Sequence, residues 1–138
     1  MAYTLTDPFR PLRGVLRLCG SVDLLLGGGL VLTPHLLLPA VGVPPGPLWA
    51  IQLAGSLLVV LGVYFLLVAG ERLLGLPTIV TCALGNGIPA LILLVAYLRQ
   101  DLAGISWLGQ AGLILLFIVL LIGAVTPLRY LQAEYRTD

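Results

Sequence analysis

Four long apolar stretches constrain what this chain can fold into more than any other feature. We place them at residues 12–32, 48–69, 76–98 and 105–125. At 1.5 Å per residue, a helix of about 20 residues is about 30 Å long, which matches the hydrocarbon core of a bilayer. The sequence therefore predicts four membrane-spanning helices within a single domain.

The composition excludes a water-soluble fold. Hydrophobic residues make up 59% of the chain and charged residues only 9%, whereas soluble domains carry about 25% charged residues. The formal net charge is +1, which gives no reason to expect a nucleic-acid partner. We expect an all-α polytopic membrane protein, a four-transmembrane-helix bundle whose first partner is the lipid bilayer.

The connection at residues 33–47 has an unusual composition for a loop. It contains five prolines and no charged residue. Three consecutive leucines, Leu36, Leu37 and Leu38, stand where a solvated loop carries polar residues. We predict that this segment lies in the membrane interface or contacts a partner protein through these leucines.

Prolines also mark the second half of the chain. Within the third stretch, Pro89 cannot donate a hydrogen bond to the carbonyl of Gly85, so we expect a kink there. The alternative is a broken helix that lines a substrate cavity. After the fourth stretch, we expect Pro127 to restart the chain as a short interfacial helix at residues 127–136.

Small residues recur at spacings of seven or fourteen within the stretches. They form four sets: Gly14, Ser21 and Gly28; Gly20 and Gly27; Gly55, Gly62 and Ala69; and Gly109 and Gly123. A helix face made of small residues lets a neighbouring backbone approach closely, so these sets predict seams of helix packing.

Arginine placement predicts the orientation of the chain. With four spans, both termini and the second connection share one side of the membrane, and the other side holds only Arg99. The arginines of the first side are Arg10, Arg13, Arg17, Arg72, Arg129 and Arg136. Because basic residues concentrate on the cytoplasmic side, we expect both termini to be cytoplasmic. Trp49 and Trp107 begin spans on the opposite side, as in an interfacial aromatic belt.

Four polar residues lie inside the stretches at two depths. The helical rise places Asp23 and Asn86 about 15 to 17 Å into their spans, near the midplane, and Gln52 and Gln110 at roughly 6 to 8 Å. We expect each of these pairs to form a hydrogen bond between helices. The alternative is that Asp23 is a functional acid, because an ionisable residue near the midplane is costly to keep.

No residue pattern indicates catalysis or a resident cofactor. Cys19 and Cys82 lie within spans, where we interpret them as small apolar fillers rather than a disulfide or a metal site. His35 is the only histidine, which excludes a two-histidine haem site. We therefore expect no catalytic, cofactor-binding or metal-binding residues, and a chain that is not itself an enzyme.

Residues 49–62 carry the pattern W-x-x-Q-L-x-G-x-L-L-x-x-L-G and follow a span that ends in a proline-containing apolar loop. Together with the chain length and the number of spans, this pattern resembles small bacterial four-helix membrane proteins of the DoxX-like kind. Some of these relatives are small subunits associated with quinone-linked respiratory systems. The resemblance implies a membrane electron-transfer setting and assigns no functional residue.

These observations lead to one expected function and one alternative. We expect a cofactor-free accessory subunit of a larger complex in the bacterial inner membrane, with a respiratory or photosynthetic electron-transfer complex as the host. The uncharged loop and the small-residue seams favour contacts with other membrane protein subunits. The alternative is a stand-alone small transporter, or a quinone- or lipid-binding protein, that works through Asp23 and Asn86.

Overall fold

The computed structural model of the chain describes residues 7–44, 46–71 and 73–134, and their side chains up to residue 131. Within these ranges the chain is helical and contains no strand. The helices are α1 (Arg10–Leu32), α2 (Pro34–Val41), α3 (Leu48–Val68), α4 (Leu76–Leu98) and α5 (Trp107–Glu134). All but α2 are long and apolar enough to cross a membrane, which confirms the predicted all-α class with four spans.

The predicted span limits agree with the helices to within two residues, except at the end of α5. We expected the fourth span to end at residue 125 and a separate interfacial helix to begin at Pro127. Instead, α5 continues through Pro127 for 28 residues in all, a length of about 42 Å. Pro127 is fully buried, and a transmembrane helix tolerates proline where neighbouring helices pack around it.

The connection at residues 33–47 contains a short helix that the sequence did not predict. α2 begins with Pro34, at a position where the missing N–H of proline removes no helical hydrogen bond. It ends at Gly42, whose φ of 78° lies in the left-handed region that glycine adopts without strain. The residues that marked this segment as a loop therefore also define the start and the end of a helix.

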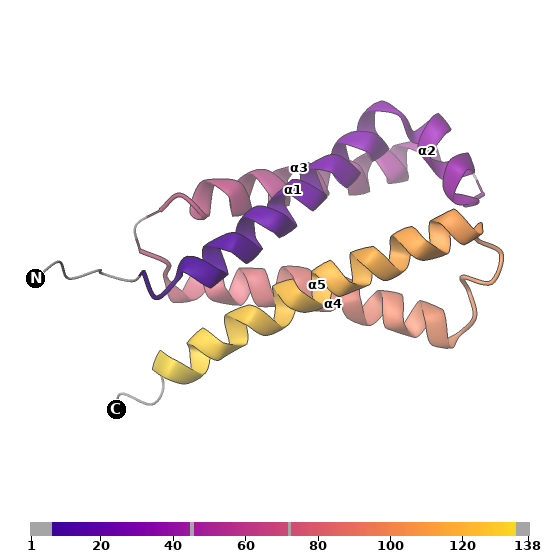
Figure 1. Cartoon of the computed structure of the whole chain (residues 1–138). Helices are drawn as coiled ribbons and strands as arrows, with labels where there is room; N and C mark the ends of the chain where they lie inside the picture. The colour runs from indigo at the N-terminus through magenta and orange to yellow at the C-terminus, as the bar shows by residue number, and fades with distance from the viewer. Residues whose placement is uncertain (1–6, 45, 72, 135–138) are drawn as a thin grey trace, which may run out of the picture.

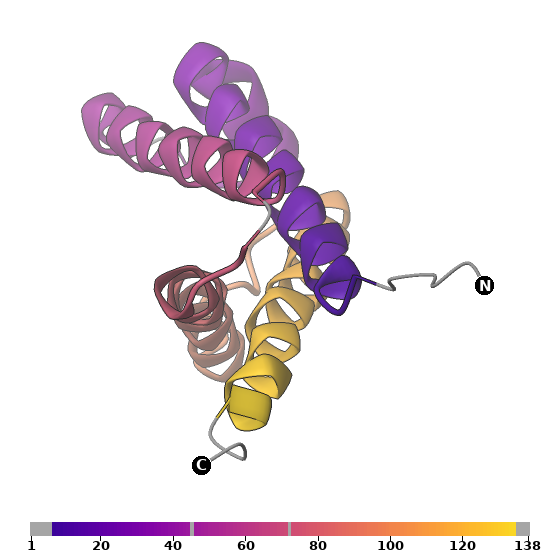
Figure 2. The same ribbon diagram turned by 90° about the vertical axis from the view of Figure 1, so that its left-hand side faces the viewer.

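The four long helices form two close pairs. α1 packs along α3, and α4 packs along α5, while the pairs contact each other mainly through α1 and α5 (Figure 1 and Figure 2). The start of α1 and the end of α5 lie at the same end of the bundle, which we call the terminal end (Figure 1). The opposite end holds α2 and the connection between α4 and α5, and we call it the α2 end.

Facing glycines hold α1 against α3. A Cβ atom added to Gly62 would lie 2.7 Å from the carbonyl oxygen of Gly20, and one added to Gly27 would lie 2.6 Å from the carbonyl oxygen of Gly55. The two backbones therefore approach more closely than residues with a Cβ atom would allow. Close backbone contact supplies the dispersion attraction that drives helix association in lipid. The predicted sets Gly20/Gly27 and Gly55/Gly62 thus pack against each other. The other predicted set of the first span does not form a seam, because Ser21 is exposed and a Cβ at Gly14 or Gly28 would meet no neighbouring helix.

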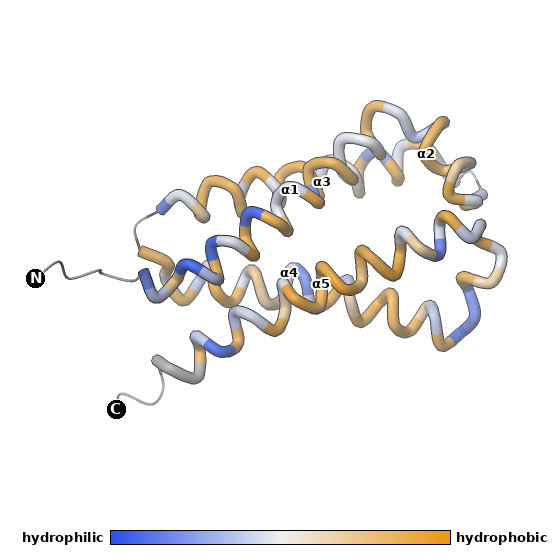
Figure 3. Tube along the Cα trace, viewed as in Figure 1, coloured by the Kyte–Doolittle hydropathy of each residue, from blue (hydrophilic) through white to orange (hydrophobic). Residues whose placement is uncertain are grey.

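Buried apolar side chains concentrate toward the terminal end. Leu12 and Leu16 of α1, Phe65 of α3 and Ile79 of α4 are buried there, and Leu131 of α5 packs against them. Elsewhere the spans expose large hydrophobic side chains. Figure 3 shows hydrophobic residues along all four long helices. This distribution suits helices whose outer faces contact lipid rather than water.

Polar contacts fix the terminal end. The ring of Tyr130 in α5 stacks on Phe9, with ring centroids 5.5 Å apart. The Nε atom of Arg13 lies 2.9 Å from a carboxylate oxygen of Asp7, and an Nη atom of Arg13 donates to the carbonyl of Ala69 at 3.3 Å. These contacts join the beginning of α1 to the ends of α3 and α5.

One serine joins two helices at the α2 end. The Ser106 hydroxyl donates to the carbonyl of Val41, the last residue of α2, at 3.0 Å. The same oxygen accepts a hydrogen bond of 3.2 Å from the backbone N–H of Gly109, which is the geometry of a helix N-cap. Ser106 therefore begins α5 and anchors the end of α2 at the same time.

Two neighbouring glycines of α1 offer a matched test of the seam. A Cβ at Gly27 would also lie 2.8 Å from the backbone nitrogen of Val59, whereas no described atom lies within 4 Å of one at Gly28. We expect Gly27→Ala to lower the free energy of unfolding by about 1–3 kcal/mol through overpacking. Gly28→Ala should leave it unchanged or raise it slightly, because alanine favours the helix. Detergent-induced unfolding followed by circular dichroism measures both, and equal stabilities would contradict the seam.

Candidate functional site

A small polar cluster lies where α1, α4 and α5 meet. Asp23 and Asn86 are only 4% and 1% exposed, and Cys19 and Cys82 are also buried. On α1, Cys19 and Asp23 are four residues apart, and on α4, Cys82 and Asn86 have the same spacing. A spacing of four places two side chains on one face of a helix. Each helix therefore presents a thiol and a polar group to the same region.

Gly123 of α5 completes this cluster. A Cβ atom added to Gly123 would lie 2.7 Å from Cγ of Asn86 and 2.7 Å from Sγ of Cys19. Any other residue at this position would therefore displace side chains of both α1 and α4. The sequence indicated Gly123 as a packing position but did not connect it with the two polar residues.

The amide and the thiols of the cluster bond to backbone carbonyls. The Asn86 side chain donates from Nδ2 to the carbonyl of Cys82 at 2.8 Å, and Cys82 Sγ donates to the carbonyl of Gly123 at 3.5 Å. Cys19 Sγ makes a longer contact of 4.0 Å with the carbonyl of Val119. Both cysteines are free and buried, in agreement with their interpretation as small fillers rather than a disulfide.

Asp23 is the exception within the cluster. Its Oδ2 atom is buried and has no hydrogen-bond partner among the described residues. The Asn86 amide donates to its own helix and not to Asp23. The structure therefore brings the two predicted residues to one interface of helices without the hydrogen bond that we expected between them. A buried carboxylate oxygen with no partner lowers stability, because burial removes its hydration and nothing replaces it.

The second predicted pair does not form. Gln52 and Gln110 are both exposed. The Gln52 amide donates to the carbonyl of Val31 at 3.4 Å, and the Gln110 amide donates to the carbonyl of Ile105 at 3.3 Å. Each amide thus bonds to a backbone carbonyl instead of to the other glutamine. Gln52 still links two helices, because Val31 belongs to α1 and Gln52 to α3.

The three leucines of the predicted contact segment differ in their exposure. Leu36 is 73% exposed, whereas Leu37 and Leu38 are half-buried. A Cδ atom of Leu37 lies 3.1 Å from the place of a Cβ on Gly29, so this leucine packs back onto α1. Of the three, Leu36 is therefore the residue that a partner would meet first.

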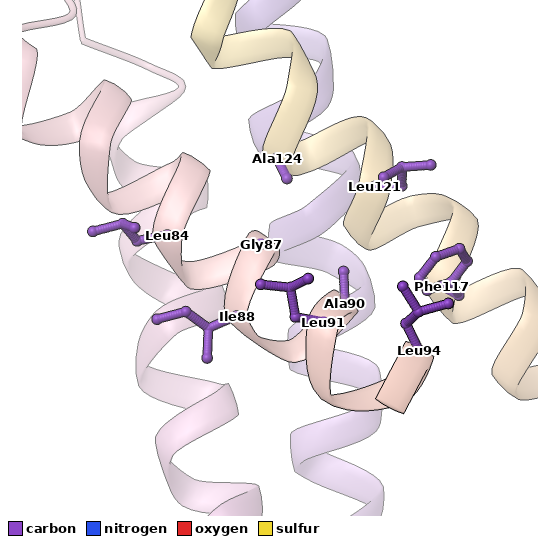
Figure 4. A pocket seen from close by; sticks show the side chains of 9 residues that line it. All are labelled: Leu84, Gly87, Ile88, Ala90, Leu91, Leu94, Phe117, Leu121 and Ala124. Carbon is purple, nitrogen blue, oxygen red and sulfur yellow. The ribbon is translucent and has the colours of Figure 1, made fainter. Parts of the chain in front are cut away.

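An apolar groove lies between α4 and α5, as Figure 4 shows. Its volume is about 310 Å³. It is lined by Leu84, Gly87, Ile88, Ala90, Leu91, Leu94, Phe117, Leu121 and Ala124. These residues offer no polar side chain to orient a substrate. The helix α4 continues through Pro89 beside this groove, which argues against a broken helix at this position.

No cluster of three or more metal-binding side chains is present in the part of the chain that the structure describes. The polar groups of Asp23 and Asn86 are open to two chemical interpretations. They can serve in helix packing that tolerates an unpaired carboxylate, or Asp23 can hold a proton or a small polar ligand.

Comparison of the chain with known protein families, with characterised proteins and with solved structures finds no match. The resemblance to DoxX-like proteins therefore stays an interpretation of the sequence pattern. The cluster around Asp23 had one signal in the sequence, the repeated spacing of four between a cysteine and a polar residue in the first and third spans.

Proposed function

We propose that this chain is a non-catalytic integral subunit of a larger membrane complex. The observation that carries the proposal is α2, an apolar helix outside the four spans that exposes Leu36. A helix with no charged residue gains little from contact with water, so its exposed apolar side chain is suited to a contact with a neighbouring membrane subunit.

The attachment of α2 supports this proposal. Its last carbonyl accepts hydrogen bonds from the Ser106 hydroxyl and from the Ser106 backbone N–H, at 3.0 and 3.3 Å. Its first turn follows α1 with only Thr33 between them. Leu36 is therefore presented by a segment that is fixed at both ends, and a pre-organised segment loses little conformational entropy on binding.

The remaining parts of the proposal come from the sequence. The host is a respiratory or photosynthetic electron-transfer complex of the bacterial inner membrane, and this chain adds no cofactor to it. The resemblance of residues 49–62 to DoxX-like proteins supports that setting. The other membrane subunits of the host would cover α2 and parts of the lipid-facing spans.

A pair of leucine substitutions tests the contact. Leu36 is 73% exposed at the α2 end, and Leu73 is 82% exposed in the connection before α4 at the terminal end. We expect Leu36→Ser to weaken binding of the chain to its complex by about tenfold or more. Leu73→Ser should stay bound, because Leu36 lies on α2 and Leu73 does not. Co-purification at rising detergent concentration measures both. Retention of the Leu36→Ser chain would exclude α2 as the contact.

The orientation proposed here places both termini in the cytoplasm. It is supported by the arginines of the terminal end, of which the structure describes Arg10, Arg13, Arg17 and Arg129. Arg99 is the basic residue at the α2 end. Basic residues next to short spans concentrate on the cytoplasmic side.

Two exposed positions test this orientation in whole cells. Gly46 lies near the α2 end and Glu71 at the terminal end, and both are exposed. We expect a membrane-impermeant maleimide to label Gly46→Cys from outside, and to label Glu71→Cys only after the membrane is opened. The buried thiols of Cys19 and Cys82 provide the unlabelled background. Labelling of Glu71→Cys in intact cells would reverse the orientation.

A second function is favoured by one specific observation, the unpartnered Oδ2 atom of Asp23. Packing alone does not need a carboxylate at this position, since a neutral side chain would cost less to bury. A small transporter, or a protein that binds a quinone or a lipid, would use such a group together with Asn86 to hold a proton or a polar ligand.

Asp23→Asn separates these two functions. The substitution keeps the shape and removes the charge, so we expect the free energy of unfolding to stay equal or to rise by about 1 kcal/mol. Under the subunit proposal, the variant assembles and the host complex keeps most of its turnover. Asp101→Asn removes an exposed acid outside the spans and serves as the control. A complex that assembles with Asp23→Asn but loses turnover or proton coupling would establish the second function.

A further inference from the structure

The outer face of α1 carries two arginines. Arg10 and Arg17 are exposed, and the side chain of each is without a hydrogen bond or an ion pair among the described residues. Seven residues of α-helix turn by nearly two full turns, so the two side chains lie about 20° apart around α1 and about 10 Å apart along it. They therefore project from one face of the helix.

The surface between the two arginines is open. Gly14 lies between them on the same face, about 40° from Arg10. No described atom lies within 4 Å of the place where a Cβ of Gly14 would be. A glycine between two arginines leaves room for a group the size of a phosphate to sit against the backbone.

The charge at this place is not neutralised by the neighbouring acid. The carboxylate of Asp7 is 2.9 Å from Nε of Arg13, and Arg13 also donates to the carbonyl of Ala69 on α3. Arg13 therefore faces α3 and holds Asp7 there. Arg10 and Arg17 are left as a positive pair on the outer face of α1.

Arg17 lies inside the span, where a charged side chain is costly unless it reaches polar groups. Side chains on a helix tilt toward its N-terminus, so the long side chain of Arg17 extends toward Gly14 and the terminal end. Guanidinium groups bind phosphate through paired hydrogen bonds. Arg17 can therefore reach a phosphate beside Gly14, and Arg10 lies about 6 Å further along the same face, toward the terminal end.

The rest of the same face is suited to a hydrocarbon chain. Toward the α2 end it continues with the small residues Ser21 and Gly28, and no described atom lies within 4 Å of a Cβ at Gly28. A line of exposed leucines runs beside them: Leu18, Leu25 and Leu32. The small residues beside these leucines make a strip of short side chains along the helix, which we call the channel.

We propose that this face of α1 binds one anionic phospholipid, with its phosphate between Arg10 and Arg17 and one acyl chain along the channel from Gly14 to Gly28. The position of Arg17 within the span favours a lipid over a phosphate free in water. The site is independent of the subunit function proposed above, since it uses neither α2 nor Asp23.

Lipid retention by the full chain tests this site. The delipidated chain in mild detergent is titrated with phosphatidylglycerol or phosphatidylcholine of the same acyl chains, and native mass spectrometry measures the bound fraction. We expect phosphatidylglycerol to bind more tightly. Because a basic residue near the membrane surface contributes about fivefold in affinity, the double variant Arg10→Gln/Arg17→Gln should bind phosphatidylglycerol about 30-fold more weakly.

A matched control separates a site from general charge. Arg129 is exposed on α5 at the same end of the bundle, and Arg129→Gln should change the affinity by less than about fivefold. Gly14→Leu keeps every charge but fills the open surface, so it should weaken phosphatidylglycerol binding as well. Because a Cβ at Gly14 would meet no atom of another helix, this variant gives an answer even where the double variant fails to fold.

Three results would overturn the proposal. The first is equal retention of the two lipids by the wild-type chain. The second is an equal loss of affinity in Arg129→Gln and in the double variant, and the third is unchanged binding in Gly14→Leu. Glycerol phosphate, which has the anionic group without acyl chains, should fail to displace the lipid; displacement at equal concentration would assign the site to a soluble anion instead.

Discussion

The close approach of α1 and α3 at their facing glycines is the contact on which the rest of the bundle depends. Lipid tails are as apolar as leucine, so burial of apolar side chains does little to hold helices together in a bilayer. Backbones that meet at Gly20 and Gly62, and again at Gly27 and Gly55, gain contact that larger side chains would prevent. Because α1 is also the helix that meets α5, its position against α3 sets where the second pair of helices joins.

The join between the two pairs has a different character. It depends on Gly123, whose missing side chain leaves room for Cys19 and Asn86, and on the contacts that Cys19 and Ser106 make with the carbonyls of Val119 and Val41. One carboxylate oxygen of Asp23 stays without a partner at this interface. Proteins retain such locally unfavourable groups most often at functional sites, so the interface that holds this unpartnered oxygen is also the one that carries a functional hypothesis.

Hydropathy predicts the spans, because lipid dictates helix length, and glycine spacing predicts the seam of α1 with α3. The same spacing also marked Gly14, Ser21 and Gly28, which lie on the outer face of α1, so spacing alone does not tell which set packs. Neither signal predicts hydrogen-bond partners. Asn86 was expected to bond Asp23, yet its amide reaches the carbonyl of Cys82 one turn back in its own helix. Gln110 likewise bonds to a nearby backbone carbonyl. Hydropathy and glycine spacing carry no signal for such local hydrogen bonds. A proline in the sequence was also ambiguous as a sign of a helix end, because Pro34 begins a helix and Pro127 lies buried within one.

The double role of Ser106 has a consequence for the order in which the bundle is completed during synthesis. The facing glycines of α1 and α3 all belong to the first 62 residues, so this pair has its contacts as soon as α3 has been made. The last carbonyl of α2 has to wait, because its hydrogen-bond donors at Ser106 come after the whole of α4. The contact between α2 and the start of α5 therefore forms late in translation, once Ser106 has been made.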